Sequence, residues 1–236
     1  MCLPAGPIST QLERSIQLPL ALARQNEAMT GELDYGRPLR EQDVDSDPLR
    51  QFAAWYAQAQ QANIRMPEAM AVASASADGA PSVRMVLMRR FDERGFVFFT
   101  NYSSRKGREL QDNQRAALLF HWDALGRQVR ITGAVQRTSA EETAAYVRKR
   151  PRGSQLSALA SPQSEVVADR EELERGVAEL AERYGDSELP IPDGWGGFRV
   201  AVDEIEFWQQ RHDRLHDRLR YRRAPDGGWK IERLGP

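Results

Sequence analysis

The sequence predicts a mainly β protein, in which an antiparallel sheet closes into a barrel and helices pack around it. Two observations support this fold class. Short stretches with apolar residues at every second position follow one another closely between residues 71 and 138. Turn sequences such as Asp78-Gly79 and Asp92-Glu93-Arg94-Gly95 join these stretches as hairpins. Short strands at this spacing favour an antiparallel barrel over a βαβ sheet.

The first half of the chain divides into an arm, a helix and a series of strands. Residues 1–45 lack sustained periodicity and are rich in Pro, Gly and charge, so we expect a mobile N-terminal arm with one short helix near Ile16–Glu27. Asp47-Pro48 signals a helix start, and apolar residues at helical spacing follow it. Further on, the predicted elements are a short polar helix over 103–113 and five strands: Ala71–Ser76, Ser82–Arg90, Phe96–Thr100, Ala116–Trp122 and Arg127–Thr138.

The second half begins with helices and returns to strands. Ser139 and Glu142 form a capping box for a helix that runs to Arg150. Another helix is predicted from Asp169 to Tyr184, with Gly185 as its C-cap, and Trp195–Phe198 is interpreted as a tight turn with an aromatic plug. The last predicted strands are Phe198–Gln209, Arg218–Arg223 and Trp229–Leu234. We therefore expect one domain over residues 46–236.

Composition argues against several classes of protein. Lys+Arg 33 nearly balances Asp+Glu 34, so the charge gives no general reason to expect a nucleic-acid or membrane partner. No apolar run approaches the ~18 residues that span a bilayer. Cys2 is the only cysteine, and no pair among His121, His212 and His216 combines i,i+4 spacing with the Glu of a zinc-protease helix. His212 and His216 are four residues apart, but the neighbouring arginines repel a cation, so no metal is expected. We expect a soluble, cytoplasmic protein.

A phosphate group has two candidate sites, neither of which is a Rossmann or P-loop glycine motif. In Ser103–Gly107, two hydroxyls and two cations stand at a helix start, which favours an anion. The alternative is an ordinary Ser N-cap followed by solvated charges. Tyr146 and Arg150 share one helix face and can converge on an oxyanion with Ser154. The alternative there is a Tyr packed on an Arg stem, with the guanidinium in water.

The basic segment over residues 211–223 allows two interpretations. Its arginines, interleaved with aromatic residues, suggest nucleic-acid binding, but Asp213 and Asp217 dilute the charge, and a solvated basic strand is the simpler interpretation. Arg214 and His216 together suit an anionic ring substrate with a titrating group, although a single histidine is more often structural. Gln128 alternates with apolar Val129 and is therefore expected to point away from the core.

Taken in chain order, several stretches resemble the pyridoxamine 5′-phosphate oxidase family from about Asp47 to Pro236. They are RMVLMR, GFVFFTNYSSRKG, RQVRITG, RPRGSQLSALASPQS, PDGWGGFRV, IEFWQQRHDRLHDR and the final WKIERLGP. The resemblance implies an FMN-binding split β-barrel that forms a homodimer, with FMN at the subunit interface and a C-terminal dimerisation region. It also implies an oxidoreductase that oxidises pyridoxamine or pyridoxine 5′-phosphate with O2. The products would be pyridoxal 5′-phosphate, H2O2 and, from the amine, NH3, in vitamin B6 biosynthesis and salvage.

The same resemblance implies site residues by position. Contacts to FMN are expected from Arg84, Met85, Val86, Leu87, Phe99, Thr100, Arg105, Lys106, Gln128, Gln163, Ser164, Trp208 and Arg218. The substrate phosphate would be held by Arg89, Tyr146, Arg150 and Ser154. Arg214 and His216 would be the catalytic residues beside the substrate ring.

The sequence departs from the family pattern at one residue and in two segments. Arg89 replaces the usual Lys, which keeps the charge but needs more room. SQLSALAS replaces the family's SQIGAWAS, and MTGELDY (Met29–Tyr35) poorly matches an N-terminal segment that can cover the site. Two alternatives use the same barrel: a flavin reductase for another substrate, and a flavin- or pyridoxal-phosphate-binding protein without oxidase turnover.

Overall fold

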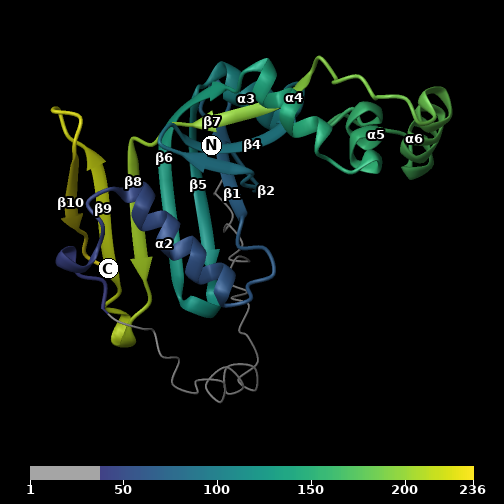
Figure 1. Ribbon diagram of the computed structural model, residues 1–236. Coiled ribbons are helices and arrows are strands. Elements are labelled where there is room, and N and C mark those ends of the chain that lie inside the picture. The colour runs from purple at the N-terminus through teal and green to yellow at the C-terminus, as the bar shows by residue number, and fades with distance from the viewer. Residues whose placement is uncertain (1–37) are drawn as a thin grey trace, which may run out of the picture. The chain divides into compact units, whose positions relative to one another are not determined.

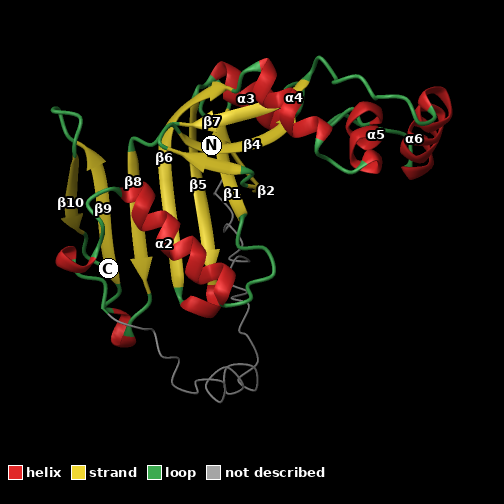
Figure 2. Ribbon diagram, in the orientation of Figure 1, coloured by secondary structure: helices red, strands yellow, loops and turns green. Residues whose placement is uncertain are grey.

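The computed structural model describes residues 38–236, which form one antiparallel sheet system with flanking helices (Figures 1 and 2). The strands are β1 (Ala69–Ala75), β2 (Pro81–Leu87), β3 (Arg90–Asp92), β4 (Gly95–Asn101), β5 (Arg115–Trp122), β6 (Arg127–Arg137), β7 (Trp195–Val200), β8 (Glu204–Gln209), β9 (Asp217–Arg223) and β10 (Trp229–Arg233). The helices are α2 (Pro48–Gln61), α3 (Arg105–Asp112), α4 (Ala140–Arg148), α5 (Arg152–Ala160) and α6 (Arg170–Tyr184). Short 3-10 turns occur at Glu41–Asp43, Asp123–Leu125 and His212–Arg214.

The strands form a ten-stranded sheet in the order β10-β9-β8-β6-β5-β1-β2, with β7 beside β6 and β4 between β7 and β3. Every pairing is antiparallel. A backbone hydrogen bond of 2.8 Å from Arg89 N to Val97 O joins the end of β2 to β4. The sheet therefore curls back on itself as a barrel, while β8, β9 and β10 extend it. The predicted fold class is confirmed.

Helix α2 covers one face of the sheet and supplies the centre of the core (Figure 1). Asp47 caps it by accepting a 2.9 Å hydrogen bond from Leu49 N, as the Asp-Pro signal predicts. Phe52 is fully buried, and its ring centroid lies 4.9 Å from that of Phe91 and 4.8 Å from that of Phe96. These rings pack edge to face, an arrangement that aromatic quadrupoles favour.

The predicted strand Phe198–Gln209 is interrupted in the structure. Val200 lies opposite Val135 of β6, whereas Glu204 lies opposite Thr132, so four steps along one strand match three along the other. This is a β-bulge, which bends a strand and increases its twist. Gly133 permits it, because a Cβ there would stand 1.5 Å from Ala201 O. The bulge separates β7, which pairs with β4, from β8, which pairs with β9.

Two local expectations were wrong. Trp195–Phe198 begins β7 and pairs with β4 rather than forming a tight turn, because its backbone groups are taken up by the neighbouring strand. Helix α5 was not predicted, because Gly153 and two serines obscure its apolar spacing. The capping box at Ser139 is confirmed, and α6 begins after Asp169 and ends before Gly185 as expected.

Residues 38–45 contact the C-terminal strands. Leu39 is buried, and its N–H donates a 3.1 Å hydrogen bond to Asp217 Oδ2. Arg233 of β10 pairs with Glu41 at 2.9 Å. The sequence assigns these residues to the N-terminal arm, whereas here they pack on the domain. The rest of that arm, with the helix expected near Ile16–Glu27 and the segment Met29–Tyr35, lies outside the described residues.

Within residues 38–236, no helix is both long and apolar enough to cross a membrane. The same part of the chain holds no group of three His, Cys, Asp or Glu side chains arranged to bind a metal ion.

Candidate functional site

A cavity of about 390 Å³ lies between β2, the end of β4, helix α3 and the end of α4. Its wall combines cations, aromatic rings and apolar side chains: Arg84, Met85, Val86, Leu87, Arg89, Phe99, Thr100, Lys106, Tyr146, Arg150, Gln163 and Trp195. All of them except Trp195 belong to the residues predicted to contact FMN or the substrate phosphate. The fold therefore brings together residues from five separate segments of the sequence.

Lys106 provides a buried positive charge in this cavity. Ser104 caps α3 by accepting a 3.2 Å hydrogen bond from Gly107 N, which fixes the first turn of the helix. Lys106 is 8% exposed, and its Nζ donates a 3.0 Å hydrogen bond to Thr100 Oγ1. Burial lowers the pKa of Lys106 and nearby Arg84 lowers it further, while Glu109 raises it. An ammonium has three donors and one of them is used by Thr100, so an anion beside Lys106 would accept a further hydrogen bond and stabilise its charged form.

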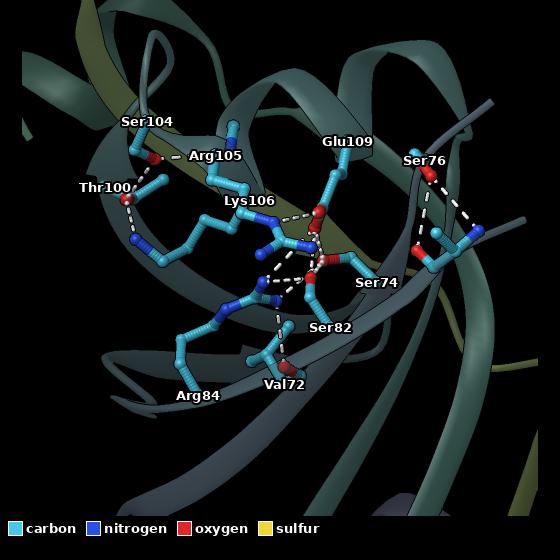
Figure 3. Close-up of polar contacts among 12 residues, drawn as sticks. Val72, Ser74, Ser76, Ser82, Arg84, Thr100, Ser104, Arg105, Lys106 and Glu109 are labelled. Carbon is cyan, nitrogen blue, oxygen red and sulfur yellow. Dashed lines mark hydrogen bonds and ion pairs between the residues drawn. The ribbon is translucent and has the colours of Figure 1, made fainter. Parts of the chain in front are cut away.

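Glu109 organises the cations on the same side of the cavity (Figure 3). Its side chain is 6% exposed, and Oε2 accepts hydrogen bonds from Ser74 Oγ at 2.6 Å, from Ser82 Oγ and from Arg84 Nη2 at 3.2 Å. Burial raises the pKa of Glu109, but the hydrogen bonds from the two serines, Arg105 and Arg84 lower it more, to about 2. Glu109 is therefore a carboxylate at neutral pH.

The charges around Glu109 leave an excess of positive charge. Arg105 Nε donates to Glu109 Oε1 at 2.9 Å, and Arg84 Nη1 also donates to Val72 O at 3.0 Å and Ser74 Oγ at 2.6 Å. Three cations surround one carboxylate: Lys106, which is buried, Arg84, which is half-buried, and Arg105, which is exposed. Positive charge that is shielded from solvent is stabilised by a counter-ion, and a phosphate group can supply it.

Aromatic rings and two further arginines form the other side of the cavity. The rings of Phe99, Tyr146 and Trp195 are within 13° of parallel, with centroids 3.9 to 5.9 Å apart. The Arg89 guanidinium lies 5.8 Å from the Tyr146 ring centroid, and that of Arg150 lies 4.8 Å from the Trp195 ring centroid. Burial lowers the pKa of Arg150, and nearby Arg89 lowers it further, whereas Tyr146 raises it.

Arg150 Nη1 is buried without a hydrogen-bond partner in the structure. A buried guanidinium nitrogen without a hydrogen-bond partner is costly, so Arg150 is suited to donate to an anionic ligand in the cavity. The expected pair of Tyr146 and Arg150 thus lies in the cavity, and the alternative of an Arg head in water does not describe Arg150.

Some predicted residues stand at the margin of the cavity. Gln163 Oε1 accepts hydrogen bonds from Thr100 Oγ1 at 2.9 Å and Asn101 N at 3.2 Å, which ties the loop after α5 to the end of β4. Ser164 follows it with a φ of 73°. Ser154 lies in the first turn of α5, and Arg105 is exposed and bonded to Glu109. Ser154, Ser164 and Arg105 do not line the cavity.

A second group of predicted residues lies on the sheet. Gln128, Trp208 and Arg218 are direct neighbours across β6, β8 and β9. The adjacent positions in these strands are buried in the core under α2, so this row faces the opposite side of the sheet. Arg218 Nε donates a 2.8 Å hydrogen bond to Glu206, which is buried.

His216 and Arg214 adjoin that row. The His216 ring centroid lies 4.7 Å from that of Trp208, and its Nδ1 accepts a 3.1 Å hydrogen bond from Arg211 N. In the neutral ring the proton is therefore on Nε2, which can donate to a ligand. Arg214 is exposed and has a φ of 60°. None of the five residues lines the cavity, so one chain carries the predicted site residues in two groups.

Sequence reasoning missed two residues of the site. Trp195 was interpreted as part of a turn, and only its pairing to β4 puts it on the cavity wall. Glu109 was included in a polar helix without a role. Its spacing of four residues from Arg105 is a signal of an ion pair, but the contact with Ser74 and Ser82 depends on the tertiary fold.

Comparison with known proteins gives consistent matches. A family model described as pyridoxamine 5′-phosphate oxidase matches residues 56–184, and one described as the pyridoxine 5′-phosphate oxidase C-terminal dimerisation region matches residues 195–236. The chain is 52% identical over 203 residues to a pyridoxine/pyridoxamine 5′-phosphate oxidase from Streptomyces avermitilis, covering 84% of this chain and 91% of that protein. A protein with the same name from Rubrobacter xylanophilus is 54% identical over 198 residues, covering 84% of this chain and 91% of its own.

Solved structures share the fold. PhzG from Burkholderia lata, in complex with tetrahydrophenazine-1-carboxylic acid, is 35% identical with a TM-score of 0.79, covering 86% of this chain and 96% of that one. A pyridoxamine 5′-phosphate oxidase-related, FMN-binding protein from Nostoc punctiforme has a TM-score of 0.64 at 17% identity, covering 80% of this chain and 98% of its own. This second likeness concerns the fold alone.

Proposed function

Because the chain belongs to the pyridoxamine 5′-phosphate oxidase family, we propose that it oxidises pyridoxamine 5′-phosphate and pyridoxine 5′-phosphate to pyridoxal 5′-phosphate, with FMN as cofactor and O2 as electron acceptor. The amine reaction consumes one O2 and one water and gives the aldehyde, NH3 and H2O2. The alcohol reaction consumes one O2 and gives the aldehyde and H2O2. The enzyme is accordingly an oxidoreductase that acts on a CH–NH2 or CH–OH group.

The observation that carries the proposal is the presence of two cationic sets in one cavity. Arg84 and Lys106 stand on the side of α3, and Arg89 and Arg150 stand on aromatic rings at the end of α4. Each set includes a cation whose pKa burial has lowered, namely buried Lys106 and half-buried Arg150, of which Nη1 is buried. Two phosphorylated ligands in one cavity would supply the two missing counter-ions.

The donor set on the α3 side fits the phosphate of FMN. Lys106 would bind it directly, and Arg84 and Arg105 would add charge from positions that Glu109 fixes. Met85, Val86 and Leu87 line the cavity as part of β2 and offer backbone groups and apolar surface to a planar ring. When bound, FMN supplies the redox chemistry, accepting two electrons from the substrate carbon and delivering them to O2.

The residues on the aromatic side suit the substrate. Arg89 and Arg150 would bind its phosphate, with Tyr146 of α4 contributing a hydroxyl. Holding the phosphate at one end fixes the distance of the reacting carbon from the cofactor, which is the protein's contribution to rate. Ser154 and Ser164 remain proposed contacts.

Arg214 and His216 are proposed to hold the substrate ring from a second protomer. The matched C-terminal region supports a homodimer, and the row Gln128, Trp208 and Arg218 would then complete the FMN site of the partner subunit. His216 Nε2–H can donate to the phenolic oxygen of the ring, and Arg214 can stabilise its negative charge. The cytoplasmic location stays a prediction from the sequence.

One experiment tests the proposal. The purified protein is examined for a visible flavin spectrum, the released cofactor is identified by chromatography, and pyridoxamine 5′-phosphate is then added in air. We expect FMN, with aldehyde and peroxide formed in equal amounts in air. Without O2, bound FMN would oxidise at most one substrate molecule per flavin, and turnover would stop there. Bound flavin without product would favour a flavin-binding relative, and a protein without flavin would contradict the proposal.

A further inference from the structure

Arg150 and Arg84 are held in opposite ways. Both terminal nitrogens of Arg84 donate to protein acceptors, namely Val72 O, the hydroxyls of Ser74 and Ser82, and Glu109. Arg150 instead has its guanidinium over the ring of Trp195, and its buried Nη1 has no hydrogen-bond partner among residues 38–236. A guanidinium held by its face keeps its in-plane N–H groups directed outward, where an anion can accept them.

Trp195 is itself fixed from three directions. It begins β7 opposite Asn101 of β4, and its N–H donates a 3.0 Å hydrogen bond to Pro192 O. Its ring lies within 13° of parallel to Phe99, at a centroid distance of 5.6 Å. It is also within 6° of parallel to Tyr146, at 5.9 Å. The ring is therefore a rigid surface, and a rigid surface restricts the long rotamer-rich side chain stacked on it.

The end of α4 gives Arg150 little support of its own. The helix ends at Arg148, and Arg150 follows just before Pro151. The structure records a backbone hydrogen bond from Arg150 N to Val147 O, but no carboxylate holds the guanidinium among the described residues. Among the residues of the cavity wall, the positive charge of Arg89 acts on Arg150 and repels it. Without the ring, like-charge repulsion would favour rotamers that turn Arg150 toward solvent.

We propose that Trp195 is a positioning residue that orients Arg150 toward the substrate phosphate and so sets the preference for phosphorylated over unphosphorylated substrates. This inference rests on the proposed function. Trp195 does not contact the reacting carbon in this role. It changes only how much the phosphate contributes to substrate binding.

The chain offers a matched control. Trp229 of β10 also carries a stacked arginine, because the Arg223 guanidinium lies 4.0 Å from its ring centroid. Trp229 does not line the cavity, and Arg223 is exposed. Replacing Trp229 therefore removes a cation–π contact of the same kind without touching Arg150.

The test compares two ligands that differ only in the phosphate, 4-deoxypyridoxine 5′-phosphate and 4-deoxypyridoxine. Neither carries an oxidisable group or a carbonyl at the reacting position, so equilibrium binding to the FMN-loaded protein can be measured by calorimetry. The dissociation constant of 4-deoxypyridoxine divided by that of its 5′-phosphate measures how much the phosphate contributes to binding. We expect Trp195→Leu to reduce this ratio about 10-fold and Trp195→Phe, which keeps a weaker π face, to reduce it about 3-fold. Trp229→Phe should leave it unchanged.

Two further readouts separate positioning from a loss of structure. FMN affinity, measured by flavin fluorescence, should stay within about 2-fold of the parent in both Trp195 variants, since the inferred effect is confined to Arg150. Equal weakening of both ligands, an unchanged ratio, or loss of FMN would overturn the inference. If Trp195→Leu does not fold, the Trp195→Phe result decides. A parent protein that binds both ligands equally would instead refute the proposed function, on which the inference depends.

Discussion

Replacing Glu109 by Gln removes the carboxylate on which the cations of α3 and β2 converge. The pKa of Glu109 falls from 4.5 to about 2 in the folded protein, because the hydrogen bonds from Ser74, Ser82, Arg105 and Arg84 outweigh its burial. Its side chain is only 6% exposed, so solvent screening is weak. A pKa lowered by that amount corresponds to about 3 kcal/mol of folding free energy at pH 7. For a chain of this size the expected fall in Tm is about 6 to 12 °C.

The stability that Glu109 contributes depends on pH. A carboxyl with a lowered folded-state pKa stabilises the protein above its unfolded pKa of 4.5, and the stabilisation is lost as the pH falls toward about 2. The gap between parent and Glu109→Gln should therefore narrow from about 3 kcal/mol at pH 7 to about 1.5 kcal/mol at pH 3. Urea denaturation of both proteins at the two pH values measures it.

A matched control is Glu165→Gln, which removes an ion pair with Arg108 whose carboxylate side chain is 55% exposed. It should change stability by less than about 0.5 kcal/mol at either pH. A Glu109→Gln protein as stable as the parent at pH 7, or a gap of the same size at both pH values, would refute the reasoning.

Three other predictions follow from particular contacts. Phe52→Ala should cost about 3 to 5 kcal/mol in unfolding free energy, because Phe52 is fully buried among the rings of Phe91 and Phe96; a loss below about 2 kcal/mol in urea would show that the core repacks. Ser139→Ala should lower the unfolding free energy by about 1 kcal/mol, since it removes the hydrogen bond from Glu142 N to Ser139 Oγ in the capping box of α4. The control in the same thermal scan is Ser157→Ala, which should change Tm less because the Ser157 hydroxyl only bonds back to Gly153 O within α5. His216→Asn should lower kcat about 100-fold while FMN affinity changes less than about 3-fold, because the ring is proposed to donate to the substrate; turnover close to that of the parent, or loss of FMN, would contradict the role.

The elements that local chemistry determines could be read from the sequence. Asp47-Pro48, the capping box at Ser139 and Gly185 each satisfy backbone groups within a few residues, and the helices begin or end there. The alternation along β1, β5 and β6 follows from the two faces of a strand. The family resemblance, carried by motifs over most of the chain, supplied the residues of the cavity.

Other features depend on residues far apart in the chain. The bulge at 201–203 exists because β7 and β8 follow β6 in registers that differ by one residue, and no property of that segment alone reveals the pairing. Helix α5 has too little apolar spacing to be recognised without its packing on α6.

The candidate site also has features that the sequence shows and features that only the tertiary structure shows. The sequence by itself determined which residue types the chain brings to phosphate chemistry, since Lys106, Arg150 and Tyr146 stand in recognisable motifs. Only the tertiary structure decided how each cation is held, with Arg84 fixed through its edges by Glu109 and Arg150 through its face by Trp195. The physical reason is that orientation and burial arise from contacts between β2, α3, α4 and β7, which are separated by up to about a hundred residues and meet only when the barrel closes.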